Sequence, residues 1–135
     1  MRVAAQTRGI LFVYDADLSL ASGLAEIAHR TFRPETYVCN LCKVTYGLVG
    51  MKRAWSDYIK QLRERGIAVD FSLRSGFRRR NPARAGDSLP ALYLRAEGEP
   101  GDLRLLVGAE AWNAATTIDE MRALVEGALA ESGLA

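Results

Sequence analysis

Two cysteines, separated by two residues, stand in the segment Cys39-Asn40-Leu41-Cys42, and the chain of 135 residues holds no others. Such a pair can form a disulfide when the α-carbons come within bonding range, and a nearby cation such as that of Lys43 favours the reactive thiolate. The same spacing supplies two of the four ligands that a structural zinc ion needs. Two buried thiols that only pack a loop are the third possibility. The residue types leave all three open.

Three further polar residues are candidates for binding. His29 is the only histidine and could serve the cysteines as a base or a ligand, although a surface histidine one helical turn from Glu26 is the simpler interpretation. Asp15 and Asp17 follow an apolar run, where open α/β sheets place their ligands. Turn and cap roles explain such aspartates more simply. His29, Asp15 and Asp17 are therefore candidate binding residues with structural alternatives.

Charge is concentrated in one segment, RSGFRRRNPARAGDS, which holds Arg74, Arg78, Arg79, Arg80 and Arg84. It has turn-forming residues and little periodicity, so residues 75–87 are expected to form an exposed, mobile loop. Arginine side chains suit phosphate or carboxylate ligands. The segment has a single aromatic residue and the chain a net charge of only +2, so a solvated loop is favoured over nucleic-acid binding.

The elements that must position these residues follow from hydrophobic patterning. The unbroken apolar run 10–14 predicts a strand covered on both faces of a sheet. A helical stripe follows and ends at Pro34, and a second stripe predicts a helix that ends at Gly66. The apolar positions of these two stripes are, respectively, Leu20, Leu24, Ile27 and Ala28, and Met51, Trp55, Tyr58, Ile59 and Leu62.

The second half of the chain predicts three strands and a closing helix. The segment 67–73 alternates apolar and polar residues, which is typical of a strand near a sheet edge. Residues 91–95 and 103–107 flank a turn-rich segment and predict a hairpin. Thr117 and Glu120 form a capping-box sequence that begins the last helix.

This order of elements resembles the thioredoxin-like fold, in which a strand–helix–strand unit precedes a β-hairpin and a closing helix. Pro90, just before the third strand, resembles the cis-proline of that fold. We therefore expect residues 1–135 to form one α/β domain, a three-layer sandwich with a central mixed sheet of about four strands and flanking helices. The cysteines depart from the pattern, because an extra helix separates them from the first strand.

Three parts of the chain resemble a family of small uncharacterised bacterial proteins: the segment YDAD (14–17), the segment AEIAHRTFRPETYVCNLCKVTYG (25–47), and the hydrophobic C-terminal hairpin and helix. Those proteins have a first strand that ends in Asn/Asp-Ala-Asp, then a histidine, then Pro-x-Thr-Tyr-x-Cys-Asn-Leu-Cys and Thr-x-Gly. The resemblance covers most of the chain, and Cys39 to Cys42 is its sharpest part. It implies no established activity.

Composition limits the class of protein. Hydrophobic residues make up 49% and charged residues 25% of the chain, as in ordinary globular proteins. The longest apolar runs are far shorter than a membrane span, and the run at 10–14 is too short for a signal peptide. We expect a cytoplasmic protein with no membrane partner. In that compartment a close cysteine pair is more often catalytic or metal-binding than structural.

The favoured function is that of a small thiol–disulfide oxidoreductase or redox-responsive protein, although the sequence does not establish an enzyme. Cys39 would attack, by analogy with other proteins that carry this motif, and Cys42 would resolve the mixed disulfide. Pro90 is counted among the binding residues. A protein disulfide or a small thiol is the expected partner, with no cofactor and no nucleic acid. The alternative is a non-catalytic binding or interaction module whose cysteines are structural or bind zinc.

Overall fold

The computed structural model describes residues 9–15, 40–47, 50–95 and 103–134. Its centre is a four-stranded mixed sheet in the order β4-β1-β5-β6. Strand β1 pairs in parallel with β4, and β5 runs antiparallel to both β1 and β6. The strands are β1 Gly9–Tyr14, β4 Ala68–Leu73, β5 Ala91–Arg95 and β6 Leu103–Val107. The predicted α/β class and the mixed sheet of about four strands are confirmed.

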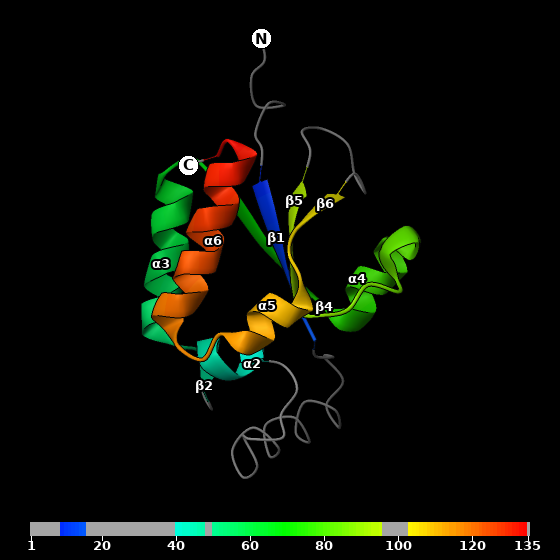
Figure 1. The fold of residues 1–135 in the computed structure, drawn as a ribbon, viewed down its shortest axis with the longest axis horizontal. Coiled ribbons are helices and arrows are strands. Elements are labelled where there is room, and N and C mark those ends of the chain that lie inside the picture. The colour runs from blue at the N-terminus through cyan, green and yellow to red at the C-terminus, as the bar shows by residue number, and fades with distance from the viewer. Residues whose placement is uncertain (1–8, 16–39, 48–49, 96–102, 135) are drawn as a thin grey trace.

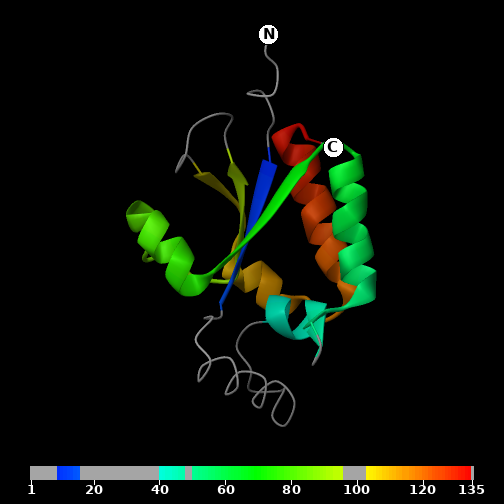
Figure 2. The same ribbon diagram turned by 180° about the vertical axis from the view of Figure 1, so that it is seen from behind.

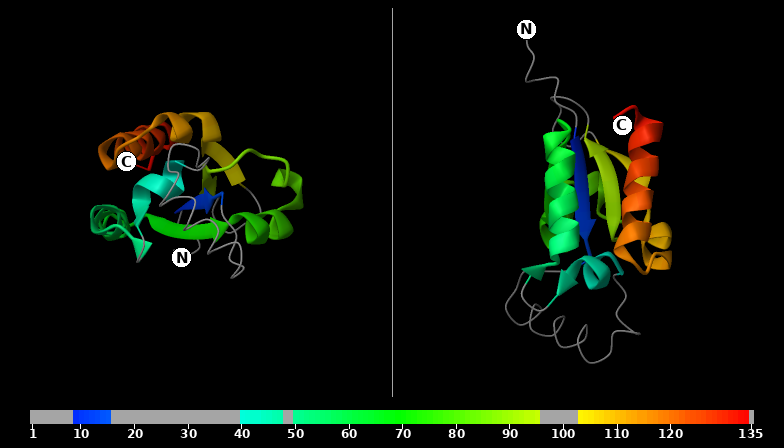
Figure 3. Two further views of the ribbon diagram at one scale, coloured as in Figure 1. Left: turned by 90° about the horizontal axis from the view of Figure 1, so that it is seen from below. Right: turned by 90° about the vertical axis from the view of Figure 1, so that its left-hand side faces the viewer.

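Helices cover both faces of this sheet. In Figure 1 the long helices α3 and α6 lie together on the left, the sheet stands in the middle, and α4 lies on the right. Figure 2 shows the same arrangement from behind, and the view from below in Figure 3 separates the layers. The helical segments are α2 Asn40–Thr45, α3 Arg53–Glu64, α4 Arg74–Arg80, the 3-10 helix η3 Pro82–Arg84, α5 Ala109–Ala114 and α6 Ile118–Ser132.

Strand β1 is buried along its whole length, as its unbroken apolar run predicted. Ile10, Phe12 and Tyr14 face the larger core beneath α2, α3, α5 and α6. The Phe12 ring stacks on Phe71 at 5.4 Å and meets the edge of Trp55 at 5.7 Å. The alternate residues face a smaller core on the α4 side, because successive side chains of a strand point to opposite faces.

The predicted helix signals are confirmed at α3 and α6. Trp55, Tyr58, Ile59 and Leu62 form the buried stripe of α3, and Gly66 follows with a φ of 87°, which favours glycine. The hydroxyl of Thr117 accepts from the backbone N–H of Glu120, and the Glu120 carboxylate accepts from the backbone N–H of Thr117. This reciprocal capping begins α6.

The structure of residues 74–84 contradicts the sequence prediction of a loop. The segment is not an open loop: residues 74–80 form α4, and residues 82–84 form η3. Phe77 explains the difference, because its fully buried ring stacks on Tyr93 at 5.1 Å. A single buried aromatic residue is enough to fix so short a helix against the sheet, yet too little to produce an apolar stripe in the sequence.

The start of α3 also differs from the sequence prediction, which placed Met51 in this helix. Helix α3 begins at Arg53, and Met51 belongs to a separate two-stranded sheet made of β2 Tyr46–Gly47 and β3 Gly50–Met51. The helix predicted over Leu20 to Ala28 lies outside the described residues.

Candidate functional site

The carboxyl ends of β1 and β4 meet at one end of the sheet. The two strands are parallel and in register, with Tyr14 opposite Leu73. Asp15 follows the first strand and Arg74 the second, and Arg74 Nη1 lies 2.5 Å from Asp15 Oδ1. Asp15, a predicted binding residue, is therefore engaged in an ion pair. Its partner is 59 positions away, and only the pairing of the strands reveals it.

Helix α2 is attached to this same end of the sheet. Thr45 is fully buried, and its hydroxyl donates to the carbonyl of Leu41 at 2.6 Å. The Thr45 Oγ1 atom also lies 3.2 Å from the hydroxyl of Tyr14. The two hydroxyl groups form a hydrogen bond in an apolar setting, where an unpaired polar group would lower stability. The sequence analysis missed Tyr14 and Thr45, for which local sequence offers no signal.

Of the two cysteines in the predicted pair, the structure describes only Cys42. Its side chain is 2% exposed and belongs to the larger core with Leu41 and Trp55. It is disulfide-bonded rather than free. It lies on α2, a short helix separate from α3, which contains Trp55. The separate β2–β3 hairpin stands between the two helices.

Pro90 lies at the same end of the sheet. It is buried directly before β5, and the Leu89–Pro90 peptide bond is cis, in agreement with the prediction for this proline. The next residue, Ala91, pairs with Val13 of β1. The register thus places Pro90 beside the strand end that carries Tyr14 and Asp15.

Three predicted site residues, Cys39, His29 and Asp17, lie outside the described residues. The structure therefore does not test whether they join Cys42 and Asp15. Within the described ranges no group of three or more His, Cys, Asp and Glu side chains could hold a metal ion.

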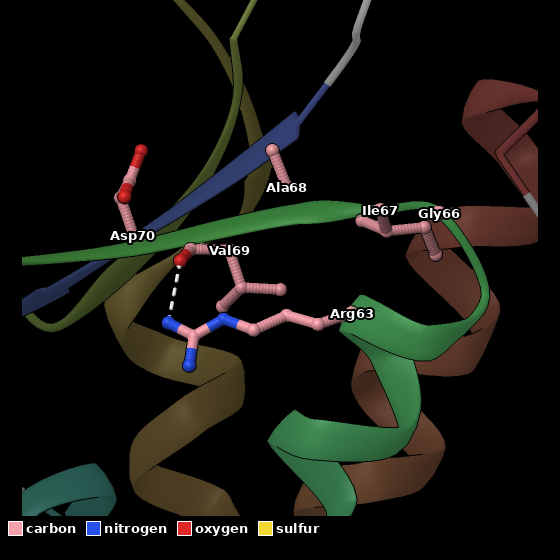
Figure 4. A pocket seen from close by; sticks show the side chains of 6 residues that line it. All are labelled: Arg63, Gly66, Ile67, Ala68, Val69 and Asp70. Carbon is pink, nitrogen blue, oxygen red and sulfur yellow. Dashed lines mark hydrogen bonds between the residues drawn. The ribbon is translucent and has the colours of Figure 1, made fainter.

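An open pocket lies at the other end of the sheet, between the end of α3 and the edge strand β4 (Figure 4). Arg63 donates from Nη2 to the carbonyl of Val69 at 2.8 Å. Asp70 projects from the opposite face of the strand (Figure 4) and accepts from Arg95. Both charged side chains of the lining are thus already paired with protein groups, so the pocket offers no reactive group. Its lining residues are Arg63, Gly66, Ile67, Ala68, Val69 and Asp70.

Groups with a shifted pKa lie away from the carboxyl end of β1. Burial, together with a hydrogen bond to Glu126, raises the pKa of Tyr58. The Arg65 guanidinium lowers the pKa of Glu126 by hydrogen bonding to it. Burial and a hydrogen bond to Asp87 raise the pKa of Tyr93. These contacts join helices or pack α4, so their role is structural.

No family model, curated protein or solved structure matches this chain. None of the helices in the described ranges is both long and apolar enough to cross a membrane.

Proposed function

We propose that this protein is a thioredoxin-like thiol–disulfide oxidoreductase, or a redox-responsive protein, that acts through Cys39 and Cys42. The observation that carries the proposal is that Cys42 is disulfide-bonded. Cys39 is the only other cysteine of the sequence, so we assign it as the bonding partner within one chain. A disulfide at this spacing is the oxidised form that such chemistry requires.

The arrangement of elements supports the thioredoxin-like part of the proposal. The unit β1–α3–β4, the hairpin β5–β6 and the closing helix α6 follow the order on which that resemblance rests. Helix α4 stands between β4 and β5, where the thioredoxin-like pattern also has a helix. The departure at the cysteines remains, because α2 carries Cys42 on a segment of its own. Fold likeness alone does not confer the activity.

The two cysteines have different roles in the proposed reaction, because Cys42 is buried. Cys42, at 2% exposure, is inaccessible to a bulky disulfide substrate, which leaves the first attack to Cys39. The Cys39 thiolate attacks one sulfur of the substrate disulfide, forms a mixed disulfide and expels the first substrate thiolate. The Cys42 thiolate then attacks Cys39 and expels the second. Two electrons pass to the substrate, whose thiolates take up protons, and an external thiol reductant must restore the dithiol.

A thiol count on the native protein tests this proposal. We expect no titratable thiol in the purified oxidised protein, two after treatment with a mild reductant, and no bound zinc in either form. Cys39→Ser should leave one thiol at position 42 that reacts slowly, because Cys42 is buried. Cys42→Ser should leave a thiol that reacts fast. Zinc bound in stoichiometric amount to reduced cysteines would contradict the proposal.

The burial of Cys42 in the larger core also favours a second candidate, a purely structural disulfide in a binding module. A structural bond resists native reduction and lowers stability when removed, typically by about 2–5 kcal/mol. Reduction under native conditions with little change in the midpoint of unfolding therefore favours the redox function. Reduction only after unfolding favours the structural one.

A further inference from the structure

Helix α4 and the 3-10 helix η3 carry a concentration of positive charge, five of the 18 lysines and arginines of the chain. Five arginines and no acidic residue stand between positions 74 and 84, whereas the net charge of the whole chain is +2. The remainder of the protein is therefore net negative. Such a separation of charge produces a local field even in a nearly neutral protein.

Two of these arginines are neutralised by carboxylates. Arg74 pairs with Asp15 at 2.5 Å, and Arg84 Nη1 lies 3.3 Å from Asp87 Oδ2. Arg84 is fixed further, because Nη2 donates to the carbonyl of Leu103 at 2.6 Å and the guanidinium lies 5.4 Å from the centre of the Tyr93 ring.

The other three, Arg78, Arg79 and Arg80, have no carboxylate partner in the described part of the chain. Arg80 Nη2 donates to the hydroxyl of Ser72 at 2.8 Å. Its guanidinium also lies over Gly76, where a Cβ atom would come within 3.2 Å of it. Arg78 reaches the carbonyl of Asp87 at 3.5 Å. Neutral acceptors thus position two of these cations without cancelling their charge.

Arg79 is exposed and makes no hydrogen bond or ion pair with any described residue. Burying or ordering like charges side by side is unfavourable unless a counter-charge is supplied. Arg78, Arg79 and Arg80 therefore present a cationic surface that no carboxylate of the described residues compensates.

An apolar residue lies on the same side of the sheet. Leu105 of β6 is 46% exposed, the single large exposed hydrophobic side chain of the described residues. It pairs across the strands with Tyr93, whose ring contacts Phe77 of α4 and the guanidinium of Arg84. Leu105 and the arginines are thus linked through one buried tyrosine.

We propose that the α4–η3 surface, defined as Arg78, Arg79 and Arg80 with Leu105 at its border, binds an acidic polypeptide segment that carries an apolar side chain. Charge complementarity selects the acidic residues, and guanidinium groups suit carboxylates. Leu105 favours a peptide over a nucleic acid, because Phe77 and Tyr93 are buried and no aromatic side chain of this surface is open to stack on bases. The proposal is independent of the chemistry of Cys42.

The test is fluorescence anisotropy with a labelled peptide of glutamate residues around a central leucine. We expect binding at low ionic strength that weakens as salt is added. Arg79→Glu, which removes no hydrogen bond or ion pair with a described residue, should weaken binding roughly three- to tenfold. Leu105→Ser should weaken it by roughly threefold.

The matched control is Lys60→Glu, which makes the same charge change at an exposed position of α3, on the other side of the sheet. It should change the affinity by less than about twofold, because α3 and α4 lie on opposite sides of the sheet, so a charge at position 60 cannot contact a peptide bound on α4. Absence of peptide binding, or equal losses in Arg79→Glu and Lys60→Glu, would overturn the proposal. Tighter binding to an oligothymidine of equal charge would contradict the peptide proposal and show that the surface prefers a nucleic acid.

Discussion

Gly9 is the described glycine at which a neighbouring backbone leaves the least room for a side chain. A Cβ atom at this position would lie 2.7 Å from the carbonyl oxygen of Ala68 on the neighbouring strand. Both groups belong to strands of the central sheet and cannot move apart without disturbing the pairing of β1 with β4. Gly9→Ala should therefore lower the free energy of unfolding by about 1–3 kcal/mol, as measured by urea denaturation.

Gly127 is the matched control for this substitution. It lies within α6, and a Cβ atom there would meet nothing within 4 Å. Gly127→Ala should raise stability by roughly 0.5–1 kcal/mol, because alanine favours the helix. Equal effects of the two substitutions would contradict the packing described for β1 and β4.

Some residues of the candidate site could be predicted from the sequence, and others could not. Asp15 and Pro90 were predicted from their places beside apolar strands, and both lie at the carboxyl end of β1. Arg74 and Thr45 were missed as members of this site. Their roles depend on which strand lies beside β1 and on where α2 packs, and neither is encoded in the neighbouring residues.

Helix α4 depends on one buried side chain. Phe77 is fully buried in the smaller core and stacks on Tyr93. Phe77→Ala should cost about 3–5 kcal/mol of stability and loosen the helix. Amide hydrogen exchange over residues 74–80 should rise in this variant and stay unchanged in Arg79→Ala, which alters only an exposed side chain. Rapid exchange in the unmodified protein would instead support the mobile loop.

Helices α3 and α6 are joined by a charged contact that responds to pH. Glu126 accepts from Tyr58 and from Arg65, with Arg65 Nη1 to Glu126 Oε2 at 2.9 Å. These contacts lower the pKa of Glu126 in the folded protein. The stabilisation is therefore present above the unfolded-state pKa and is lost as the pH falls through the folded-state value.

Glu126→Gln measures this contribution. Because both side chains of the Arg65–Glu126 pair are more than a third exposed, screening keeps it below about 1 kcal/mol. The variant should be less stable than the unmodified protein at neutral pH and equally stable in acid, in paired denaturation curves. A difference that persists unchanged in acid would show that the Glu126 charge is not its source.

At the scale of elements, periodicity predicted the sheet strands and the two long helices because each buries a regular face. Periodicity did not predict elements that bury a single residue or that are too short to show a repeating pattern. Helix α4 contributes Phe77 alone to the core, so its segment showed no stripe. The two-residue strands β2 and β3 are too short for any period, which explains why Met51 was assigned to the following helix.

In the whole molecule, the residues of the two proposals lie on opposite faces of the sheet. The larger core, beneath α3 and α6, encloses Cys42, and α2 is tied to β1 through the contact between Thr45 and Tyr14. The other face is covered by α4 (Figure 1), and Arg78, Arg79 and Arg80 of this helix have no carboxylate partner among the described residues. The proposed redox chemistry and the proposed peptide surface are thus separate and can be removed independently.

The central claim, that Cys39 and Cys42 exchange disulfides in the native protein, is tested most directly by equilibration in glutathione buffers of graded potential, followed by thiol alkylation and intact-mass measurement. We expect a reversible transition between disulfide and dithiol that follows a two-electron curve, with a tenfold change in their ratio for about every 30 mV. Cys39→Ser should abolish the transition. A disulfide that stays unchanged at every potential until the protein unfolds would contradict the claim.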